Sequence, residues 1–376
     1  MYLTCGTLAS YLIARETLEP QSIVRGDFVI VEAGRRNRNF KVFQTGAPGL
    51  FVKQAPMPVA EVHETLRREA IVHEMISTRP SFAVLSDMIL QMRDYDPRRS
   101  TITFELAAQG RNLHEVFQAD GSDQPGVARQ IGRRLARLHA AGSAIMADAE
   151  ALHTFPRRQP WILHMARNAE SIMPGMSEGQ RQVVAALRGD PALLALFDAL
   201  VAEWRENAFC HGDVKWDNML LIGPAGEEAD IRLIDWELAD IADAAWDVGC
   251  AVASFLQRAA MFGGATPHVA GPAAAPGYDL SQRAAARESA NALVSIQLLL
   301  QSYLEAFRVG GGPVEAEVRH RVTRFTVGRL VLAAFEMVAG APRITPQVEA
   351  MMRLASHMAA NPAQAAARLF TPSGTR

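Results

Sequence analysis

The most constraining feature of this sequence is a polar segment flanked by apolar runs: FCHGDVKWDNML at 209–220, followed by IRLIDWE at 231–237. The apolar runs predict two strands, and the polar residues between them predict a tight loop. We expect this strand–loop–strand segment to gather five polar side chains: His211, Asp213, Lys215, Asn218 and Asp235.

Residues of these types at this spacing suit phosphoryl transfer. One carboxylate must orient the acceptor's hydroxyl proton, while another carboxylate and an amide oxygen hold Mg2+ against nucleotide phosphates. Asp213 is the candidate base, and Asn218 and Asp235 are the candidate metal ligands. Lys215 can stabilise charge on the transferred phosphoryl group, and His211 is expected to brace the loop. An ordinary polar turn is the competing interpretation, but such a turn does not need all five residues.

HGDVKWDN followed by IDWE resembles the aminoglycoside phosphotransferase and choline kinase family, a branch of the protein-kinase-like fold. The resemblance covers most of residues 23–255 in order. It implies a kinase that uses ATP and Mg2+, with Asp213 as the base and Asn218 and Asp235 as metal ligands. It also implies that Asp247, in WDVG at 246–249, braces the catalytic loop.

The family's fold class is α+β and bilobal, with a small antiparallel-sheet N-lobe and a mainly helical C-lobe. Local patterns agree with this. Beta-branched and aromatic runs predict strands from Ile23, at 38–45, 50–55, 83–92 and 100–106, and apolar spacing predicts a helix at 62–77. Residues 1–106 are therefore expected to form the N-lobe and residues 107–376 the C-lobe.

Helical periodicity dominates the remainder of the chain. Helices are predicted near 9–18, 127–141, 161–172, 177–188, 191–206, 243–261, 281–308, 313–340 and 346–369. A stretch of Gly, Ala and Pro at 263–277 interrupts the series and can bury little apolar surface. We expect a flexible loop there, either a plain linker or a lid on the acceptor side.

A nucleotide site also needs a cation for the phosphates and a carboxylate that holds this cation. Lys53 in FVKQ and Glu69 on the following helix resemble the family's Lys–Glu pair in order and separation. Glu64 and Glu74 are alternatives for the carboxylate. The competing interpretation is a lysine and a glutamate that both face solvent.

Two further stretches are expected to contact the nucleotide. The resemblance places the interlobe hinge at 104–107, so backbone groups of Glu105 and Ala107 would pair with the adenine edge. The phosphate-covering hairpin is expected in VEAGRRNRNFKV, where Gly34 stands in place of a full glycine pattern. The arginines within 35–38 either contact phosphate or acceptor, or form a solvated basic turn.

Charge bears on the acceptor. Residues 251–376, which should form the acceptor side, contain twelve arginines, no lysine and seven acidic residues. A site for a polycation should instead be lined with carboxylates. Unless these arginines only face water, the balance disfavours aminoglycosides and choline-like cations. It favours neutral or acidic hydroxyl compounds, including Ser or Thr of a peptide.

The loop H-G-D-x-K-x-x-N is closer to Ser/Thr protein kinases than to antibiotic kinases. RRNRNFKV with FVKQ is also similar to the kinase-like enzymes of class V lanthipeptide and thioamitide pathways, which implies a precursor-peptide acceptor and a partner lyase. Three hypotheses remain: a kinase with an unspecified hydroxyl acceptor such as a small molecule, a peptide-modifying kinase, and a nucleotide-binding pseudokinase scaffold. The complete set of site residues argues against the scaffold.

Charge and composition limit the partners, the membrane association and the cellular compartment that we expect. The formal net charge of −2 gives no steering toward nucleic acid or an anionic membrane. The apolar run at 289–304 contains Asn291, Gln297 and Gln301 and predicts a buried helix rather than a membrane span. Three widely spaced cysteines do not form a disulfide framework, so a reducing cytoplasm is expected.

Overall fold

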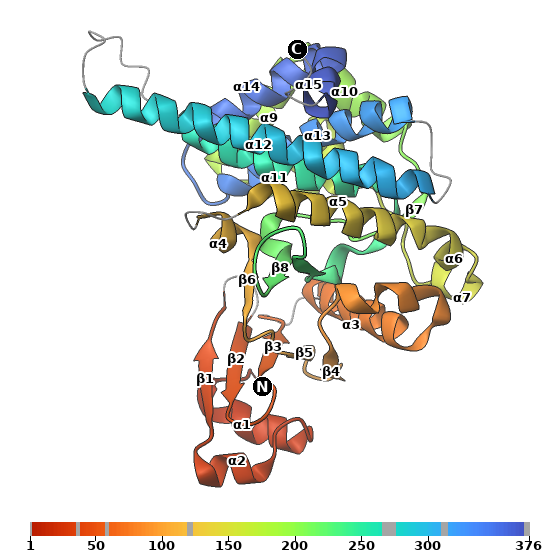
Figure 1. Cartoon of the computed structure of the whole chain (residues 1–376), viewed down its shortest axis with the longest axis vertical. Helices are drawn as coiled ribbons and strands as arrows, with labels where there is room; N and C mark the ends of the chain where they lie inside the picture. The colour runs from red at the N-terminus through yellow and green to blue at the C-terminus, as the bar shows by residue number, and fades with distance from the viewer. Residues whose placement is uncertain are drawn as a thin grey trace.

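The computed structural model describes residues 2–34, 38–56, 60–118, 123–264, 276–309 and 315–371. The predicted α+β fold class is confirmed, because an antiparallel sheet near the N-terminus precedes a mostly helical remainder (Figure 1). In Figure 1 the sheet occupies one end of the long axis, and the later helices gather at the other end. The lobe boundary between residues 106 and 107 remains our proposal.

The N-terminal sheet has five antiparallel strands in the order β1-β2-β3-β5-β4. The strands are β1 (Phe28–Glu32), β2 (Arg38–Gln44), β3 (Leu50–Gln54), β4 (Met92–Asp96) and β5 (Thr101–Glu105). Side chains alternate between the two faces of a strand. Val42 and Val52 therefore share one face, where α1 (Cys5–Ala14) packs, while Lys53 points to the face near α3 (Ala60–Thr78).

Two predictions in this part of the chain are wrong. Residues 83–88 belong to a 3-10 helix, η1 (Pro80–Met88), rather than to a strand. The buried side chains of Phe82, Leu85 and Met88 recur every third residue, which is the period of a 3-10 helix. The first strand begins at Phe28 rather than Ile23, because α2 (Pro20–Arg25) starts at a proline and ends before Gly26, at φ 66°.

The structure also corrects the C-terminal end. One helix was expected at 346–369, but α14 (Pro346–Ala360) and α15 (Pro362–Phe370) are separate. Pro362 cannot donate a backbone hydrogen bond and begins the second helix, which explains the break. For the predicted loop at 263–277, α11 (Ala244–Gly264) ends and α12 (Pro276–Val309) begins at its borders, and residues 265–275 lie outside the described residues.

Helices and two small sheets make up the rest of the described residues. The helices not yet introduced are α4 (Leu113–Gln118), α5 (Gln124–Ala140), α6 (Gly142–Met146), α7 (Ala149–Leu152), η2 (Trp161–His164), α8 (Met165–Ile172), α9 (Glu178–Gly189), α10 (Pro191–Ala202), η3 (Trp216–Asn218), η4 (Trp236–Leu238) and α13 (Glu315–Met337). The strands are β6 (Gly110–Asn112), β7 (Ala208–Cys210), β8 (Met219–Ile222), β9 (Asp230–Leu233) and β10 (Asp240–Ala242). They pair as β6-β8-β9 and as β10-β7.

Helix α13 lies at the centre of the helical part. Every residue from 321 to 335 is buried, and the helix packs against α9, α11 and α14. At its crossing with α11, a Cβ added to Gly249 would lie 2.9 Å from the backbone nitrogen of Thr326, so the two helices approach closely. This position brings α13 close to the loop that carries Asp213.

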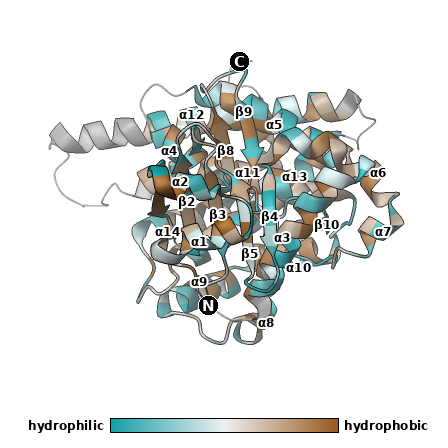
Figure 2. Ribbon diagram, turned by 90° about the horizontal axis from the view of Figure 1, so that it is seen from below, coloured by the Kyte–Doolittle hydropathy of each residue, from teal (hydrophilic) through white to brown (hydrophobic). Residues whose placement is uncertain are grey.

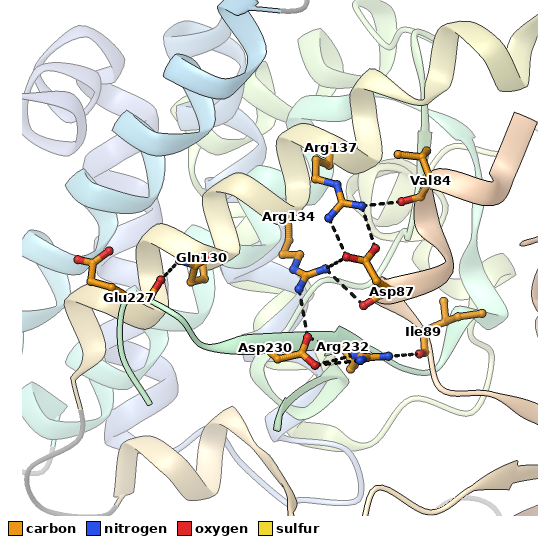
Figure 3. Close-up of polar contacts among 9 residues, drawn as sticks. All are labelled: Val84, Asp87, Ile89, Gln130, Arg134, Arg137, Glu227, Asp230 and Arg232. Atoms are coloured by element: carbon orange, nitrogen blue, oxygen red, sulfur yellow. Dashed lines mark hydrogen bonds and ion pairs between the residues drawn. The ribbon is translucent and has the colours of Figure 1, made fainter. Parts of the chain in front are cut away.

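Polar contacts bond the segment between α3 and β4 to the helical part (Figure 3). Arg134 and Arg137 on α5 each donate to the Asp87 carboxylate at 2.8 Å. Arg134 also bonds Asp230 at 3.1 Å, and Arg232 donates to the Ile89 carbonyl at 3.1 Å. We call Asp87, Arg134, Arg137, Asp230 and Arg232 the η1 clamp.

Most helices carry hydrophilic and hydrophobic residues side by side, as Figure 2 shows. This mixture is typical of amphipathic helices around a shared core. Within the part of the chain that the structure describes, no helix combines the length and the hydropathy needed to cross a membrane.

Candidate active site

The backbone of the catalytic loop is held by Asp247, on α11. Its carboxylate accepts hydrogen bonds from the backbone N–H groups of His211 and Gly212 at 2.7 and 2.8 Å. Gly212 has φ 86°, and a Cβ at this position would collide with the carbonyl oxygen of Leu238, so the turn requires glycine. The brace that the resemblance implied for Asp247 is therefore present.

His211 fills the space behind the loop. Its Nε2 donates to the carbonyl oxygen of Ile234 at 2.9 Å, and its Nδ1 accepts from the Asp213 N–H at 3.3 Å. Both ring nitrogens are thus engaged in the neutral tautomer. This arrangement matches the predicted bracing role and leaves no nitrogen for proton transfer.

Asp213, the candidate base, has different neighbours at its two oxygens. Oδ2 lies 2.6 Å from Lys215 Nζ and accepts from Asn218 Nδ2 at 3.0 Å. Oδ1 faces the guanidinium of Arg329, whose Nη2 lies 3.6 Å away. Burial alone would raise the pKa of Asp213, but Lys215 and Arg329 outweigh burial and lower it below its ordinary value. Asp213 is therefore ionised at neutral pH.

The two candidate metal ligands lie at adjacent strand ends. The N–H of Ile234 donates to the backbone carbonyl of Asn218 at 3.0 Å, which sets Asp235 beside Asn218. The Asn218 amide nitrogen also donates to the Asp213 carbonyl at 3.0 Å, so its side-chain oxygen stays free of hydrogen bonds to described residues. A free amide oxygen next to a partly exposed carboxylate is a hard oxygen donor set that fits Mg2+.

Lys53 joins this group from the sheet. Its Nζ lies 2.6 Å from Glu69 Oε2 and also contacts Asp235 Oδ1. Burial would lower the pKa of Lys53, but the carboxylates of Glu69 and Asp235 outweigh burial and raise it, so the ammonium stays charged. Burial raises the pKa of Glu69, and Lys53 opposes that rise. The structure thus brings Lys53, Glu69 and Asp235 together.

The alternative carboxylates do not join them. Glu64 pairs with Arg67 at 2.8 Å on the outside of α3, and Glu74 is exposed. Glu69 is therefore the partner of Lys53.

In the predicted interlobe hinge, a backbone N–H group lacks a hydrogen-bond partner among the described residues. The N–H of Glu105 donates to the Gln91 carbonyl, and the carbonyl of Ala107 accepts from the Gly110 N–H, both at 2.8 Å. The N–H of Ala107 has no partner among the described residues, so it is available for an adenine edge. The Glu105 side chain pairs with Arg93 at 2.5 Å.

The predicted phosphate-covering hairpin is described in part. Gly34 is exposed just after β1, whereas Arg35 and Arg36 lie outside the described residues. Arg38 pairs with Glu32 at 3.5 Å, on the sheet face opposite Lys53. This position favours the solvated basic turn for Arg38.

Sequence reasoning missed two residues of the site. Arg329 on α13 is 4% exposed and donates from Nη1 to Glu336 Oε2 at 2.9 Å. Asn39 lies directly opposite Lys53 in the strand pairing, and its buried Oδ1 has no hydrogen bond to any described residue. An orphaned polar atom beside a buried lysine fits a site that receives a polar ligand.

A buried trio behind the loop has another role. Metal-ligating atoms of His139, Cys210 and Asp247 lie within 4.8 Å of one another. The Asp247 oxygens already accept the loop N–H groups, and burial raises the pKa of Cys210, which keeps its thiol protonated. The trio is therefore a packing element.

Comparisons with known proteins bear on the family and the fold of this chain. The model of the phosphotransferase enzyme family matches residues 27–279. Among the curated proteins, none matches the sequence.

Solved structures share the fold at low identity. An ethanolamine kinase from Plasmodium vivax is 13% identical, with a TM-score of 0.57 over 97% of this chain and 92% of that one. The GDP complex of aminoglycoside 2'-phosphotransferase-IIIa is 13% identical, with a TM-score of 0.53 over 96% and 100%. Amicoumacin kinase hAmiN, in complex with AMP-PNP and Ca2+, is 10% identical, with a TM-score of 0.52 over 94% and 96%. Because the family match spans well over half of the sequence, this chain belongs to the phosphotransferase enzyme family.

Proposed function

We propose that the protein is an ATP- and Mg2+-dependent O-phosphotransferase that moves the γ-phosphoryl group of ATP to a hydroxyl acceptor. The contact of Lys53 with both Glu69 and Asp235 carries this proposal. It joins the sheet to the strand end that also holds Asn218 and Asp213. A nucleotide half and a catalytic half therefore meet at one place.

The nucleotide would take over contacts that the protein now makes with itself. Phosphate oxygens would replace Asp235 as a partner of Lys53, while Glu69 keeps the ammonium in place. Asp235 and Asn218 would hold Mg2+, which neutralises charge on the phosphate oxygens. The AMP-PNP and Ca2+ complex of amicoumacin kinase supports a nucleotide and a divalent cation in this fold. The GDP complex of aminoglycoside 2'-phosphotransferase-IIIa makes GTP a second nucleotide to test.

The transfer itself is an in-line substitution at phosphorus. The acceptor oxygen bonds to the γ-phosphorus, the bond from that phosphorus to the bridging oxygen breaks, and ADP leaves. The acceptor's hydroxyl proton passes to Asp213, whose lowered pKa keeps it ready to accept a hydrogen bond. Lys215, beside Asp213, offsets negative charge on the transferred group.

A small-molecule acceptor is favoured. The three solved structures compared above are kinases of ethanolamine, an aminoglycoside and amicoumacin. The excess of arginines at 251–376 says little about the charge of the acceptor, because several of these arginines form ion pairs with acidic residues. Those pairs are Arg258–Glu288, Arg319–Glu315, Arg321–Asp243 and Arg324–Glu203.

A Ser or Thr acceptor in a precursor peptide, followed by elimination by a partner lyase, is the narrower alternative. It rests on Lys215 in the catalytic loop and on the basic stretch at 35–38. A precursor-peptide gene beside a lyase gene would favour it over a small molecule.

The deciding experiment compares Asp213→Asn with Asp217→Asn, an exposed aspartate of the same loop. ADP release and a mass gain of about 80 Da on the acceptor measure phosphoryl transfer. We expect Asp213→Asn to lower turnover about a hundredfold to ten-thousandfold while nucleotide affinity is kept. Asp217→Asn should resemble the wild type.

Undiminished turnover in Asp213→Asn would remove this residue as the base. A wild-type protein that binds nucleotide but transfers phosphate to no acceptor would favour the scaffold hypothesis.

A further inference from the structure

Arg329 is a buried arginine with an incomplete set of partners. Its side chain is 4% exposed, and its Nη1 donates to Glu336 at 2.9 Å. Nη2 points toward Asp213 Oδ1 but stays 3.6 Å away, and it donates no hydrogen bond to any described residue. A guanidinium presents paired donors that match a carboxylate. One half of this fork is therefore open, next to the candidate base.

The two oxygens of Asp213 indicate where the acceptor approaches. Oδ2 is occupied by Lys215 and Asn218, whereas Oδ1 accepts no hydrogen bond from the described residues. An acceptor hydroxyl must therefore bond to Oδ1, on the side of Arg329. A hydroxyl oxygen lies about 2.7 Å from its acceptor. Adding the 3.6 Å to Nη2 places the hydroxyl oxygen within about 6 Å of this donor.

We propose that Arg329 binds a carboxylate of the acceptor, and that the acceptor is a hydroxy acid whose carboxylate lies one or two carbons from the reacting hydroxyl. This inference rests on the proposed phosphotransferase function. The short separation requires the two groups to be near neighbours in the molecule. A carboxylate completes the guanidinium fork, while a cationic group would be repelled by Arg329 and Lys215.

Glu336 fits the same arrangement. It is 44% exposed and would by itself attract a cation, but its Oε2 is already bonded to Arg329. The nearby side chains thus comprise two carboxylates, Asp213 and Glu336, and two cations, Lys215 and Arg329. The open donor belongs to Arg329, so the group recognised at this point is an anion.

Three matched probes test the inference: glycerate, glycerol and 3-amino-1,2-propanediol, which share a diol and differ in the end group. ADP release with Mg-ATP gives kcat and KM for each probe. We expect the wild type to prefer glycerate over the amine by about tenfold or more in kcat/KM. Arg329→Gln should bring this ratio close to one, mainly through a higher KM for glycerate.

Arg324→Gln is the matched control, because Arg324 is buried on the same helix but pairs with Glu203. It should keep the glycerate preference. Arg329→Lys retains the charge without the fork and should give an intermediate ratio. If Arg329→Gln does not fold, as judged by thermal unfolding, Arg329→Lys decides the test.

A wild type that prefers the amine, or Arg329 variants that keep the full preference, would overturn the inference. The inference would also be overturned if ADP release depends on Asp213 but does not increase when glycerate is added. A different result would contradict the proposed function itself, namely equal ATP turnover in the wild type and in Asp213→Asn.

Discussion

The carboxylate of Asp247 accepts the backbone N–H of His211 at 2.7 Å, across 36 residues of sequence. This bond and its neighbour at Gly212 attach the catalytic loop to α11, so the position of Asp213 depends on a fully buried charge. Loop geometry and helix packing are therefore coupled at this point.

Replacing Asp247 with Asn should weaken the brace, since an amide offers one acceptor oxygen where the carboxylate offers two. We expect a loss of about 1–3 kcal/mol in the free energy of unfolding, together with lower turnover. Urea unfolding and ADP release measure the two effects. Asp217→Asn, in the exposed part of the loop, is the control, and equal behaviour of the two variants would contradict the brace.

Lys53→Met should impair Mg-ATP use far more than Lys41→Met. Both lysines lie in the N-terminal sheet, but Lys41 is exposed and Lys53 contacts Glu69 and Asp235. We expect a fall in kcat/KM for ATP of about a hundredfold or more with Lys53→Met, because a preorganised charge is lost from the site. Near-normal kinetics in that variant would exclude Lys53 from phosphate binding.

The η1 clamp should contribute little to stability. Asp87 is 47% exposed and Arg134 is 16% exposed, so water screens their attraction. A double-mutant cycle with Asp87→Asn and Arg134→Gln is expected to give a coupling energy of about 1 kcal/mol or less. A coupling of several kcal/mol by urea unfolding would show that the clamp supports the fold rather than only orienting η1.

His73 should make stability depend on pH. Burial, with Lys53 nearby, lowers the pKa of His73 from 6.5 to about 3, so the folded chain holds it neutral. On acidification the unfolded chain protonates His73 at a higher pH than the folded chain does. The contribution of His73 to the free energy of unfolding is therefore complete above pH 6.5 and falls as the pH drops toward 3. The expected slope is about 1.4 kcal/mol per pH unit below about pH 6.

Urea unfolding of the wild type and of His73→Gln at several pH values between 7 and about 4.5 isolates this contribution. The variant should lose stability less steeply on acidification. Parallel curves for the two proteins would contradict the assignment.

Local spacing was enough to predict the catalytic loop. Asp213, Lys215 and Asn218 occupy one turn, so their neighbourhood follows from the chain itself. The pairing of Lys53 with Glu69 was implied by the resemblance to the family's Lys–Glu pair, and the structure separates Glu69 from the alternatives Glu64 and Glu74. In contrast, the strand predicted at 83–92 is wrong for residues 83–88, because the buried side chains there recur every third residue, as in a 3-10 helix, and do not alternate as in a strand.

Arg329 could not be predicted as a neighbour of Asp213 by spacing. The two residues are 116 positions apart, and their contact depends on the packing of α13 against the catalytic segment. One sequence signal was available. Arg329 interrupts the apolar stretch from Phe325 to Phe335, and a charge within a buried helix requires a partner.

The backbone of Asp235 has φ 67° and ψ 56°, in the left-handed region that Asn, Asp and Gly adopt most readily. An Asp235→Asn exchange would therefore preserve the shape of this turn while removing the negative charge offered to a cation. A single nucleotide change in an aspartate codon yields asparagine. We therefore expect that a related protein can lose phosphoryl transfer through this single substitution and still keep the same fold.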